Sequence, residues 1–428
     1  MEQIFYPADI LLPDSDIDMN KWSVIACDQF TSEPGYWDEV EKLVDDAPST
    51  LRLTLPEVYL DTDQEEDKLS SIRQAMKNYM DGHLLTVYKD AMIYIEREDS
   101  RGKTRAGIIG AVDLDQYDYH KGSTSPVRAT EGTIEERIPP RLRVRQNASV
   151  ELPHIMMLID DRERKVIESL GKRTAEMKLL YDFDLMKGGG HLKGWLLTDD
   201  LQRKVIRDLQ AYAESENGVS GDAADAAPLI FAVGDGNHSL ATAKEYYEQL
   251  KADHPGEDLS GHPARFALAE VVNLHSPALE FEAIHRIVTN VNADDLFHHM
   301  TKELGLVRED DNASQSMTVV LKGQEEKVYI TRPSSRLTVG SLQHFLDRYM
   351  EEHSETEDIR IDYIHGRDNL KALTWQNGSI GFLLPEMTKE DLFPSVKANG
   401  ALPRKTFSMG HAEDKRYYTE CRRIRESE

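Results

Sequence analysis

The segment from Leu229 to Leu250 constrains the fold of this chain more than any other. It opens with a compact apolar run of the kind found in a central strand, and the turn Gly-Asp-Gly-Asn-His-Ser follows directly. Beyond the turn, apolar residues recur at the spacing of one helical face, at Leu240, Ala243, Tyr247 and Leu250. The segment therefore predicts a strand, a tight turn and a helix.

The turn has the residues of an anion-binding helix end. Gly234 and Gly236 permit positive φ and a close approach of the backbone to a ligand. The side chains suited to capping the helix are Asp235, Asn237 and Ser239. The dipole and N–H groups of such an end favour phosphate or carboxylate, and His238 adds a hydrogen bond or, when protonated, a positive charge. A capped strand-to-helix junction without a ligand explains the same residues, so both interpretations stay open.

The turn matches neither of two common phosphate-binding motifs. It lacks the Gly-Lys-Ser/Thr of a Walker loop, and its glycines do not fit the dinucleotide fingerprint. Asp235 would also repel a phosphate, unless a metal ion bridges the two or the carboxylate acts as a base. The turn thus predicts where an anion binds and leaves the ligand unidentified.

Short apolar runs alternate with amphipathic stretches along the chain, which predicts a mixed α/β or α+β fold. We expect a long charged helix over Asp161 to Tyr181 and a polar surface loop over Ala213 to Ala227. From about Asn292 the chain has a simpler alternation of helices and strands. We therefore expect a larger α/β body over residues 1–290 and a smaller C-terminal α/β region over residues 291–428.

The net charge excludes one class of partner. The formal charge of -26, from 51 Lys plus Arg against 77 Asp plus Glu, opposes binding to nucleic acid, whose backbone is held mainly by cations. A small anionic ligand can still bind at a local positive site.

No apolar stretch reaches the ~20 residues of a membrane span, and the amino end lacks a signal-peptide pattern. We expect a cytoplasmic protein with no membrane partner, and the oligomeric state stays open.

One stretch of this acidic chain is conspicuously basic, with Arg128, Arg137, Arg141, Arg143 and Arg145. Planar guanidinium groups suit phosphate or carboxylate ligands. Local pairing in a solvated network explains the same pattern, through the carboxylates Glu131, Glu135 and Glu136. Pro139 and Pro140 predict a stiff, extended segment that presents its side chains.

Other candidates lie elsewhere along the chain. Asp28 follows an apolar strand and can position a substrate amine or a magnesium ion, or it can cap a helix that begins near Glu33. Cys27 suggests a Cys–His nucleophile with His238, although a lone strand cysteine is more typical of a buried apolar residue. A further group for the same pocket comprises His285, Arg286, Lys405 and Ser408. No His or Cys metal motif occurs, so we expect no structural metal site.

The turn and other segments resemble one protein family. GDGNHSLATA, which contains the turn, resembles the Asp-Gly-His-His-Arg turn of the bacterial and archaeal domain of unknown function 1015 family. Further similar segments follow the family order, at Ile25 to Asp28, Arg128 to Arg143, Leu279 to Val288 and Asn399 to Ser408. The resemblance implies a core distantly similar to the ParB/sulfiredoxin fold, whose members include nucleotide-binding clamps, sulfiredoxin and free-serine kinases.

Two residues depart from the pattern of these relatives. Where sulfiredoxin has a catalytic cysteine, this chain has Asn237, which argues against sulfiredoxin chemistry. Where relatives have an arginine after the histidine, this chain has Ser239 and so lacks a bidentate phosphate ligand. The resemblance also makes site candidates of Arg128, Glu131 and Arg137.

The residues and the resemblance together favour a nucleotide-dependent phosphotransferase for a small hydroxylated metabolite such as an amino acid. In this hypothesis the turn holds phosphates and the arginine-rich stretch neutralises charge. Asp28 or Asp235 is then the base, or a ligand of Mg²⁺ that arrives with the nucleotide. A non-catalytic nucleotide- or metabolite-binding regulatory protein is the alternative, and a hydrolase or transferase that uses Cys27 ranks last.

Overall fold

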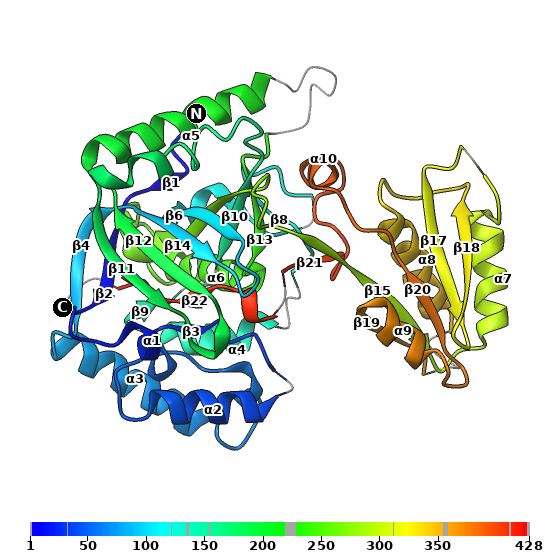
Figure 1. The fold of residues 1–428 in the computed structure, drawn as a ribbon, viewed down its shortest axis with the longest axis horizontal. Helices are drawn as coiled ribbons and strands as arrows, with labels where there is room; N and C mark the ends of the chain where they lie inside the picture. Colours follow the sequence, from blue (N-terminus) through cyan, green and yellow to red (C-terminus); the bar gives the residue numbers. More distant parts are fainter. Residues whose placement is uncertain are drawn as a thin grey trace. The chain divides into compact units, whose positions relative to one another are not determined.

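The computed structural model describes residues 2–31, 33–120, 122–133, 137–152, 155–218, 228–310, 312–353, 358–410 and 412–425. The chain forms two compact units: unit 1 comprises Met1–Glu280 and Gly410–Glu428, and unit 2 comprises Phe281–Met409. Unit 2 begins ahead of the boundary expected near residue 290, and the last part of the chain belongs to unit 1. The mixed α/β class predicted from the sequence is confirmed (Figure 1).

Within the described residues, ten strands form the large mixed sheet of unit 1 (Figure 1). In sheet order they are β11 (Lys178–Asp184), β12 (His191–Leu196), β5 (Ile93–Glu98), β6 (Thr104–Asp113), β14 (Phe266–Asn273), β10 (Met156–Ile159), β13 (Phe231–Asp235), β8 (Val127–Ala129) and β7 (Tyr117–Asp118), with β1 (Phe5–Tyr6) paired to β6. β10 runs parallel to β14 and antiparallel to β13. The sheet therefore differs from the all-parallel sheet of a doubly wound fold.

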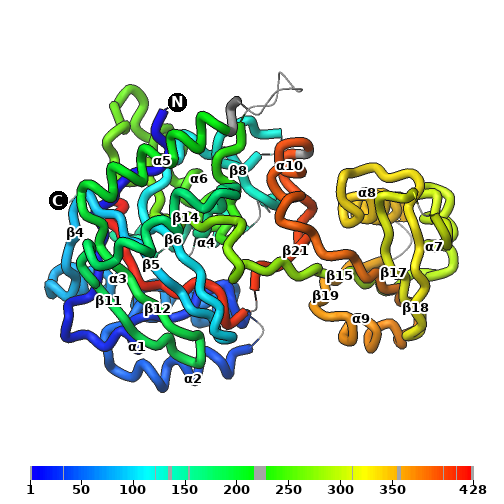
Figure 2. The backbone as a smooth tube through the Cα atoms, turned by 45° about the horizontal axis from the view of Figure 1, so that its top comes forward, coloured from blue at the N-terminus to red at the C-terminus, as the bar shows by residue number. Residues whose placement is uncertain are grey.

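Smaller elements complete the described part of unit 1. A second sheet contains β4 (Leu85–Ala91), β2 (Ala8–Pro13), β23 (Cys421–Arg423) and β9 (Val150–Glu151), and a strand pair contains β22 (Tyr417–Tyr418) and β3 (Val24–Ile25). The α-helices are α1 (Met19–Trp22), α2 (Pro34–Val44), α3 (Glu65–Asp81), α4 (Ile138–Gln146), α5 (Asp199–Gly218) and α6 (Asn237–Asp253). The 3₁₀ turns are η1 (Thr50–Arg52), η2 (Glu57–Tyr59), η3 (Leu114–Gln116), η5 (Gly171–Glu176), η6 (Met186–Gly188), η7 (Pro263–Arg265) and η8 (Ala412–Asp414). Figure 2 shows the C-terminal segment, in red, running back among these elements.

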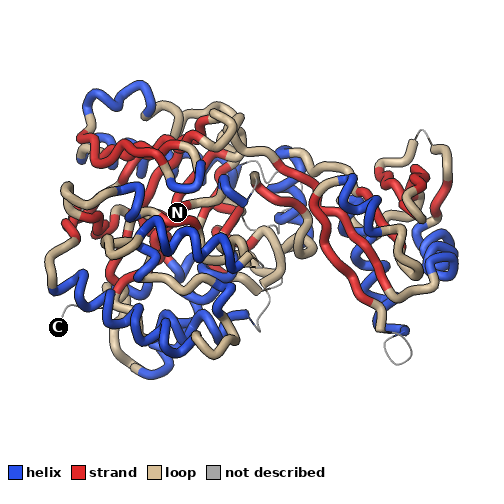
Figure 3. Tube along the Cα trace, turned by 60° about the horizontal axis from the view of Figure 1, so that its bottom comes forward, coloured by secondary structure: helices blue, strands red, loops and turns tan. Residues whose placement is uncertain are grey.

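Apolar cores cover both faces of the large sheet, where helices pack against strands (Figure 3). Adjacent residues Ile108 and Ile109 of β6 belong to different cores, because successive strand residues point to opposite faces. One core packs the sheet against α5 and α6 through residues such as Leu209 and Leu240. The other includes Val40 of α2 and the residues of the second sheet. The helix that follows the turn is therefore anchored along its predicted apolar face.

Two regions fold differently from the sequence prediction. The long helix predicted over Asp161 to Tyr181 is wrong, since the chain forms turns, η5 and the start of β11 there. The Asp161 carboxylate accepts the Val166 N–H at 2.8 Å, and Arg164 has a left-handed φ of 54°, so side-chain bonding and backbone conformation both oppose a helix. The loop predicted over Ala213 to Ala227 is wrong in its first part, because α5 continues through Gly218. Residues 219–227 lie outside the described residues.

Unit 2 has its own sheet and core. Its described strands, in sheet order, are β16 (Leu306–Val307), β18 (Gln324–Ile330), β17 (Gln315–Leu321), β20 (Ile380–Leu383), β15 (Phe281–Thr289) and β19 (Arg360–His365), with β21 (Phe407–Met409) paired to β15. Its α-helices are α7 (Ala293–Leu304), α8 (Thr338–His353), α9 (Arg367–Leu373) and α10 (Lys389–Asn399). α7 and α8 pack on the sheet through an apolar core that includes Leu296, Leu342 and Phe382. Across the described ranges of both units, no helix is long and apolar enough to cross a membrane.

A buried ion network holds the returning C-terminal segment in unit 1. Glu270 of β14 is fully buried, and it accepts from Arg105 at 3.1 Å and from Arg416 at 2.9 Å. Arg416 also bonds Glu420 at 2.7 Å. Burial by itself raises the pKa of Glu270, but Arg105 and Arg416 reverse this effect and hold the pKa below its ordinary range. The segment is thus joined to the large sheet by charges that have little access to water.

Glu270→Gln removes the negative charge that compensates two buried guanidinium groups. We expect the free energy of unfolding to fall by ~3–5 kcal/mol, because breaking a buried pair leaves charge uncompensated. Urea denaturation followed by circular dichroism measures the change. Since the folded-state pKa of Glu270 is lowered, its stabilising contribution is present above the unfolded pKa of ~4.3 and is lost as the pH falls through the lower folded value.

Asp200→Asn is the matched control, since it breaks the exposed pair of Arg203 and Asp200, whose side chains are 61% and 87% exposed. Exposed pairs contribute roughly 0–1 kcal/mol, so we expect little change in stability. An equal loss of unfolding free energy in the two variants would show that the buried network does not hold unit 1 together.

Candidate functional site

The predicted strand, turn and helix are confirmed, with β13 ending at Asp235 and α6 beginning at Asn237. The residue at the cap position is Gly236 instead of one of the polar residues expected there. Its φ of 77° is left-handed, and a Cβ at this position would lie 2.9 Å from the Cα of Ile155. Glycine is therefore required by both conformation and space. Gly234, in contrast, is an ordinary residue of β13.

Both carboxylate oxygens of Asp235 are engaged. Oδ1 accepts the Gly236 N–H at 2.9 Å, and Oδ2 lies 3.1 Å from the Nζ of Lys415. Lys415 comes from the returning C-terminal part of unit 1. Its charge compensates the carboxylate that would otherwise repel an anion at the end of α6. Lys415 therefore reduces the electrostatic repulsion between Asp235 and a phosphate, and a metal ion is not required for this.

The side-chain carbonyl oxygen of Asn237 is buried and has no hydrogen-bond partner among the described residues. Only 6% of the residue is exposed. An unpaired buried polar group costs about 1–3 kcal/mol, which a hydrogen bond with a ligand offsets. Rotating the amide exchanges the acceptor for two donors, so Asn237 can complement a hydroxyl group or a phosphate oxygen.

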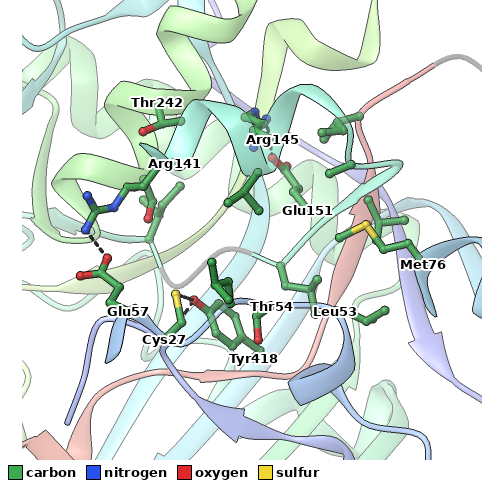
Figure 4. A pocket seen from close by; sticks show the side chains of 18 of the residues that line it. Cys27, Leu53, Thr54, Glu57, Met76, Arg141, Arg145, Glu151, Thr242 and Tyr418 are labelled. Atoms are coloured by element: carbon green, nitrogen blue, oxygen red, sulfur yellow. Dashed lines mark hydrogen bonds and ion pairs between the residues drawn. The ribbon is translucent and has the colours of Figure 1, made fainter. Parts of the chain in front are cut away.

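A cavity of about 160 Å³ lies beside the first turn of α6. Ser239 and Thr242 line it together with Ile155, the residue packed against Gly236. Thr242 donates its hydroxyl to the carbonyl of His238 at 2.7 Å, and both His238 and Ser239 are half-buried. The other polar or ionisable lining residues are Cys27, Thr54, Glu57, Arg141, Arg145, Glu151 and Tyr418 (Figure 4). The predicted anion-binding turn therefore contributes one residue, Ser239, to the lining of the cavity.

α4 brings two arginines of the basic stretch to this cavity. The two prolines of the stretch lie in the first turn of the helix, where proline is tolerated, so the extended segment predicted here is wrong. Arg141 and Arg145 share a helical face because they are spaced by one turn. Arg141 pairs with Glu57 (Figure 4). Arg145 pairs with Glu151 at 2.7 Å.

Glu151, a second carboxylate of the cavity lining, has three partners. Besides Arg145, it accepts from the Nε of Arg422 at 2.9 Å and from the Leu268 N–H at 2.8 Å. Burial raises the pKa of Glu151, but Arg422 and Arg145 outweigh burial and hold the pKa below the ordinary value. The Nε of Arg145 is buried and has no hydrogen-bond partner among the described residues. The charged lining groups are thus paired mainly with one another.

Cys27 lines the same cavity, and the Tyr418 hydroxyl donates a hydrogen bond to its sulfur at 3.0 Å (Figure 4). Burial, together with the carboxylates of Asp28 and Glu57, raises the pKa of the Cys27 thiol to about 12. A thiol with so high a pKa is a poor nucleophile at neutral pH. The raised pKa of the thiol therefore disfavours the hypothesis in which Cys27 attacks a substrate.

Of the candidates in the turn, Ser239 lines the cavity, and Gly234 to His238 are not among its lining residues. Four candidates of unit 1 from outside the turn do not line it either: Asp28, Arg128, Glu131 and Arg137. Arg128 is buried in β8 and donates to the backbone carbonyls of Ser125 and Pro228 at 2.7 and 3.2 Å. Its guanidinium group therefore has a structural role. Arg137 is the exposed cap residue of α4, and Glu131 is half-buried. Asp28 does not cap α2, whose cap residue is Glu33. Glu135 and Glu136 lie outside the described residues.

The remaining candidates belong to unit 2: His285, Arg286, Lys405 and Ser408. Arg286 is fully buried and donates to the carbonyls of Arg404 and Lys405 at 3.0 and 2.7 Å, so it fixes this part of unit 2. Burial, with the nearby charge of Arg286, lowers the pKa of His285 to about 4, and its imidazole is neutral at pH 7. The Lys405 side chain is exposed, and Ser408 lies on β21.

Sequence reasoning missed the site residues that come from distant parts of the chain: Glu57, Glu151, Lys415 and Tyr418. The adjacent cations Lys415 and Arg416 were a usable signal, because two consecutive positive charges in so acidic a chain need acidic partners. Nothing local distinguishes Tyr418 from the neighbouring Tyr417. Its position follows only from the pairing of β22 with β3.

In the folded protein we expect Cys27 to resist iodoacetamide at pH 8. A thiol with a pKa of about 12 is thiolate in only about one molecule in ten thousand at that pH, whereas the same residue in the unfolded chain, with a pKa of ~8.5, reacts readily. Mass spectrometry of the labelled protein, with and without urea, measures the difference. Cys421→Ala is the control, since it leaves Cys27 as the single cysteine. Fast labelling of the folded variant would restore Cys27 as a candidate nucleophile.

Comparison with known proteins gives a family and distant structural likenesses. No curated protein matches this chain. Similar solved structures include a conserved hypothetical protein from Pyrococcus furiosus, 11% identical with a TM-score of 0.36, over 71% of this chain and 90% of that chain. A free serine kinase variant in complex with ADP is 10% identical with a TM-score of 0.39, over 74% of this chain and 91% of that chain. SbnI with C-terminal truncation from Staphylococcus aureus is 9% identical with a TM-score of 0.36, over 71% and 82%. At these TM-scores the likenesses carry no argument for a ligand or an activity.

A family model described as protein of unknown function (DUF1015) matches residues 11–349. The match contains the turn and three of the other segments on which the resemblance rests, Ile25 to Asp28, Arg128 to Arg143 and Leu279 to Val288. Asn399 to Ser408 lies beyond it. The similarity to the ParB/sulfiredoxin fold stays a prediction. Because the matched residues make up most of the chain, this protein belongs to the DUF1015 family.

Proposed function

We propose that this protein binds a small phosphorylated molecule, with a nucleotide as the leading class, and transfers its phosphoryl group to a small hydroxylated metabolite. The observation that carries the proposal is the amino end of α6, where the buried Asn237 has no partner for its carbonyl oxygen among the described residues. The helix dipole places partial positive charge at the same end. A phosphate ester with a free hydroxyl group satisfies both features at once.

Lys415 supports the proposal because it provides a cation at this helix end. The arginine that the family pattern has in place of Ser239 is missing here, and Lys415 lies instead beside Asp235, one residue before the helix cap. An ammonium group is an effective phosphate partner, although it binds as a point charge and not as a fork. The site therefore combines a dipole, a cation and an orphaned polar side chain in a chain of strongly negative net charge.

Phosphoryl transfer needs little beyond this arrangement. The acceptor hydroxyl oxygen attacks phosphorus, the bond from phosphorus to the leaving oxygen breaks, and the hydroxyl proton passes to a carboxylate. Asp235 and Asp28 are the carboxylates proposed for this role. Among the described residues no group of three or more His, Cys, Asp or Glu side chains is arranged to hold a metal ion. Mg²⁺ would then be held mainly by the phosphates of the nucleotide, with one protein carboxylate.

A second candidate function is binding without catalysis. It is favoured by the engagement of Asp235, whose two oxygens already accept from Gly236 and from Lys415. Before this carboxylate could take a substrate proton, one of its oxygens would have to give up an existing partner. In that case the site recognises a nucleotide or metabolite and reports its presence.

Ser239→Asp separates anion binding from folding. An aspartate in the first turn of a helix interacts favourably with the dipole, so we expect thermal stability to be kept. A negative charge on the wall that faces the ligand should weaken binding of ADP by at least about tenfold. Isothermal titration calorimetry and thermal melting measure the two properties. Ser239→Asn is the neutral control. Undiminished ADP binding by the aspartate variant would show that the phosphate does not bind at this helix end.

Asp235→Asn separates binding from turnover. The substitution keeps a side-chain oxygen for the Gly236 N–H and leaves the charge of Lys415 uncompensated, so ADP binding should be equal or tighter. Loss of the base should reduce phosphoryl transfer by about 100-fold or more. The assay supplies ATP and Mg²⁺ with a pool of free amino acids, and ³¹P NMR detects a phosphorylated product. If the native protein binds nucleotide and phosphorylates no acceptor, the second candidate function is correct.

A further inference from the structure

The cavity beside α6 is lined mostly by apolar side chains that belong to the protein core. Leu53, Met76 and Val150 are examples, and all three are buried members of the same hydrophobic cluster. Figure 4 shows Leu53 and Met76 among the lining residues, together with the arginines of α4. An open cavity with such walls favours an uncharged group that can remove apolar surface from water.

The cavity volume sets the size of that group. Its volume of about 160 Å³ is close to the ~150 Å³ of an apolar cavity that holds benzene in another protein. It is well below the ~300–1,000 Å³ of pockets that enclose a whole drug-sized ligand. The cavity therefore fits one ring or a branched aliphatic group, and not an entire nucleotide.

The charged groups of the lining are paired with one another, and the buried Nε of Arg145, which has no partner among the described residues, offers the occupant one hydrogen-bond donor. Arg141 pairs with Glu57 and Arg145 pairs with Glu151. A charged occupant would lose its hydration here without gaining an unpaired counter-ion. The amino end of α6 differs, since it combines the helix dipole with Lys415.

We propose that the ligand has two unlike parts: an anionic group at the amino end of α6, and an aromatic or branched aliphatic group of about the size of benzene that fills the cavity. The inference rests on the proposed function and names the ligand class, a phosphate joined to an apolar group. Ser239 and Thr242 line the cavity from α6 itself, so one small molecule can reach both places. A wholly polar metabolite would leave the apolar walls unfilled.

The test compares methyl phosphate with phenyl phosphate by calorimetry. The two esters have the same anionic group, and burying the ring should make phenyl phosphate bind roughly tenfold to hundredfold more tightly. Ala148→Leu extends a buried lining residue into the cavity, so it should remove this preference while keeping methyl phosphate binding and thermal stability. Ala75→Leu is the matched control, because Ala75 packs against the same core and does not line the cavity. If Ala148→Leu does not fold, Val144→Phe fills the cavity from α4.

The outcomes separate this inference from the proposed function. Equal binding of the two esters by the native protein overturns the inference and leaves the phosphate site intact. An unchanged preference in the cavity-filling variant overturns it as well. If neither ester binds, the proposed function fails, and phenol then tests the cavity by itself: binding that Ala148→Leu abolishes supports an apolar ligand group, and no binding identifies the cavity as a packing void. AMP as a third probe shows whether the ring that fills the cavity can be a nucleobase.

Discussion

The tie between the returning C-terminal segment and the large sheet is the interaction on which unit 1 depends. Consecutive residues Lys415 and Arg416 pair with Asp235 of β13 and Glu270 of β14. In the sheet register Met156 of β10 lies opposite Asp235 on one side and Glu270 on the other, so the two ion pairs span three neighbouring strands. Without the segment, Asp235 would lose its cation and the fully buried Glu270 would keep Arg105 as its direct partner. The cost of buried, uncompensated charge therefore links the end of the chain to its centre.

The same tie determines the chemistry that the site can perform. In a chain with a net charge of -26, an anion site has to be built from local features. The arginines nearest the cavity are occupied by Glu57 and Glu151, so the positive potential comes from the dipole of α6 and from Lys415. Binding energy is thus divided between a polar helix end and an apolar cavity. Such a division favours molecules with two chemically different ends.

The sequence predicted the parts of the site that local pattern determines. The apolar strand, the glycine turn and the one-sided helix are all within one short segment, and each is present in the structure. Composition could not show whether a guanidinium group meets a ligand or the backbone, as Arg128 and Arg286 illustrate by bonding carbonyls. Prolines were misjudged because they are tolerated in the first turn of α4. The pairing of Asp235 with Lys415 depends on tertiary structure alone. The two residues are too far apart in the sequence for a helix or strand periodicity to predict it.

The position of β23 has a consequence for how the protein is made. This strand lies between β2 and β9, whose residues are synthesised long before it. At ~5–20 residues per second, a delay on the order of tens of seconds separates the emergence of β9 from that of β23. Throughout that interval the nascent chain exposes an unpaired edge of β2, which can pair with other chains. Unit 1 can therefore finish folding only after unit 2 has been translated.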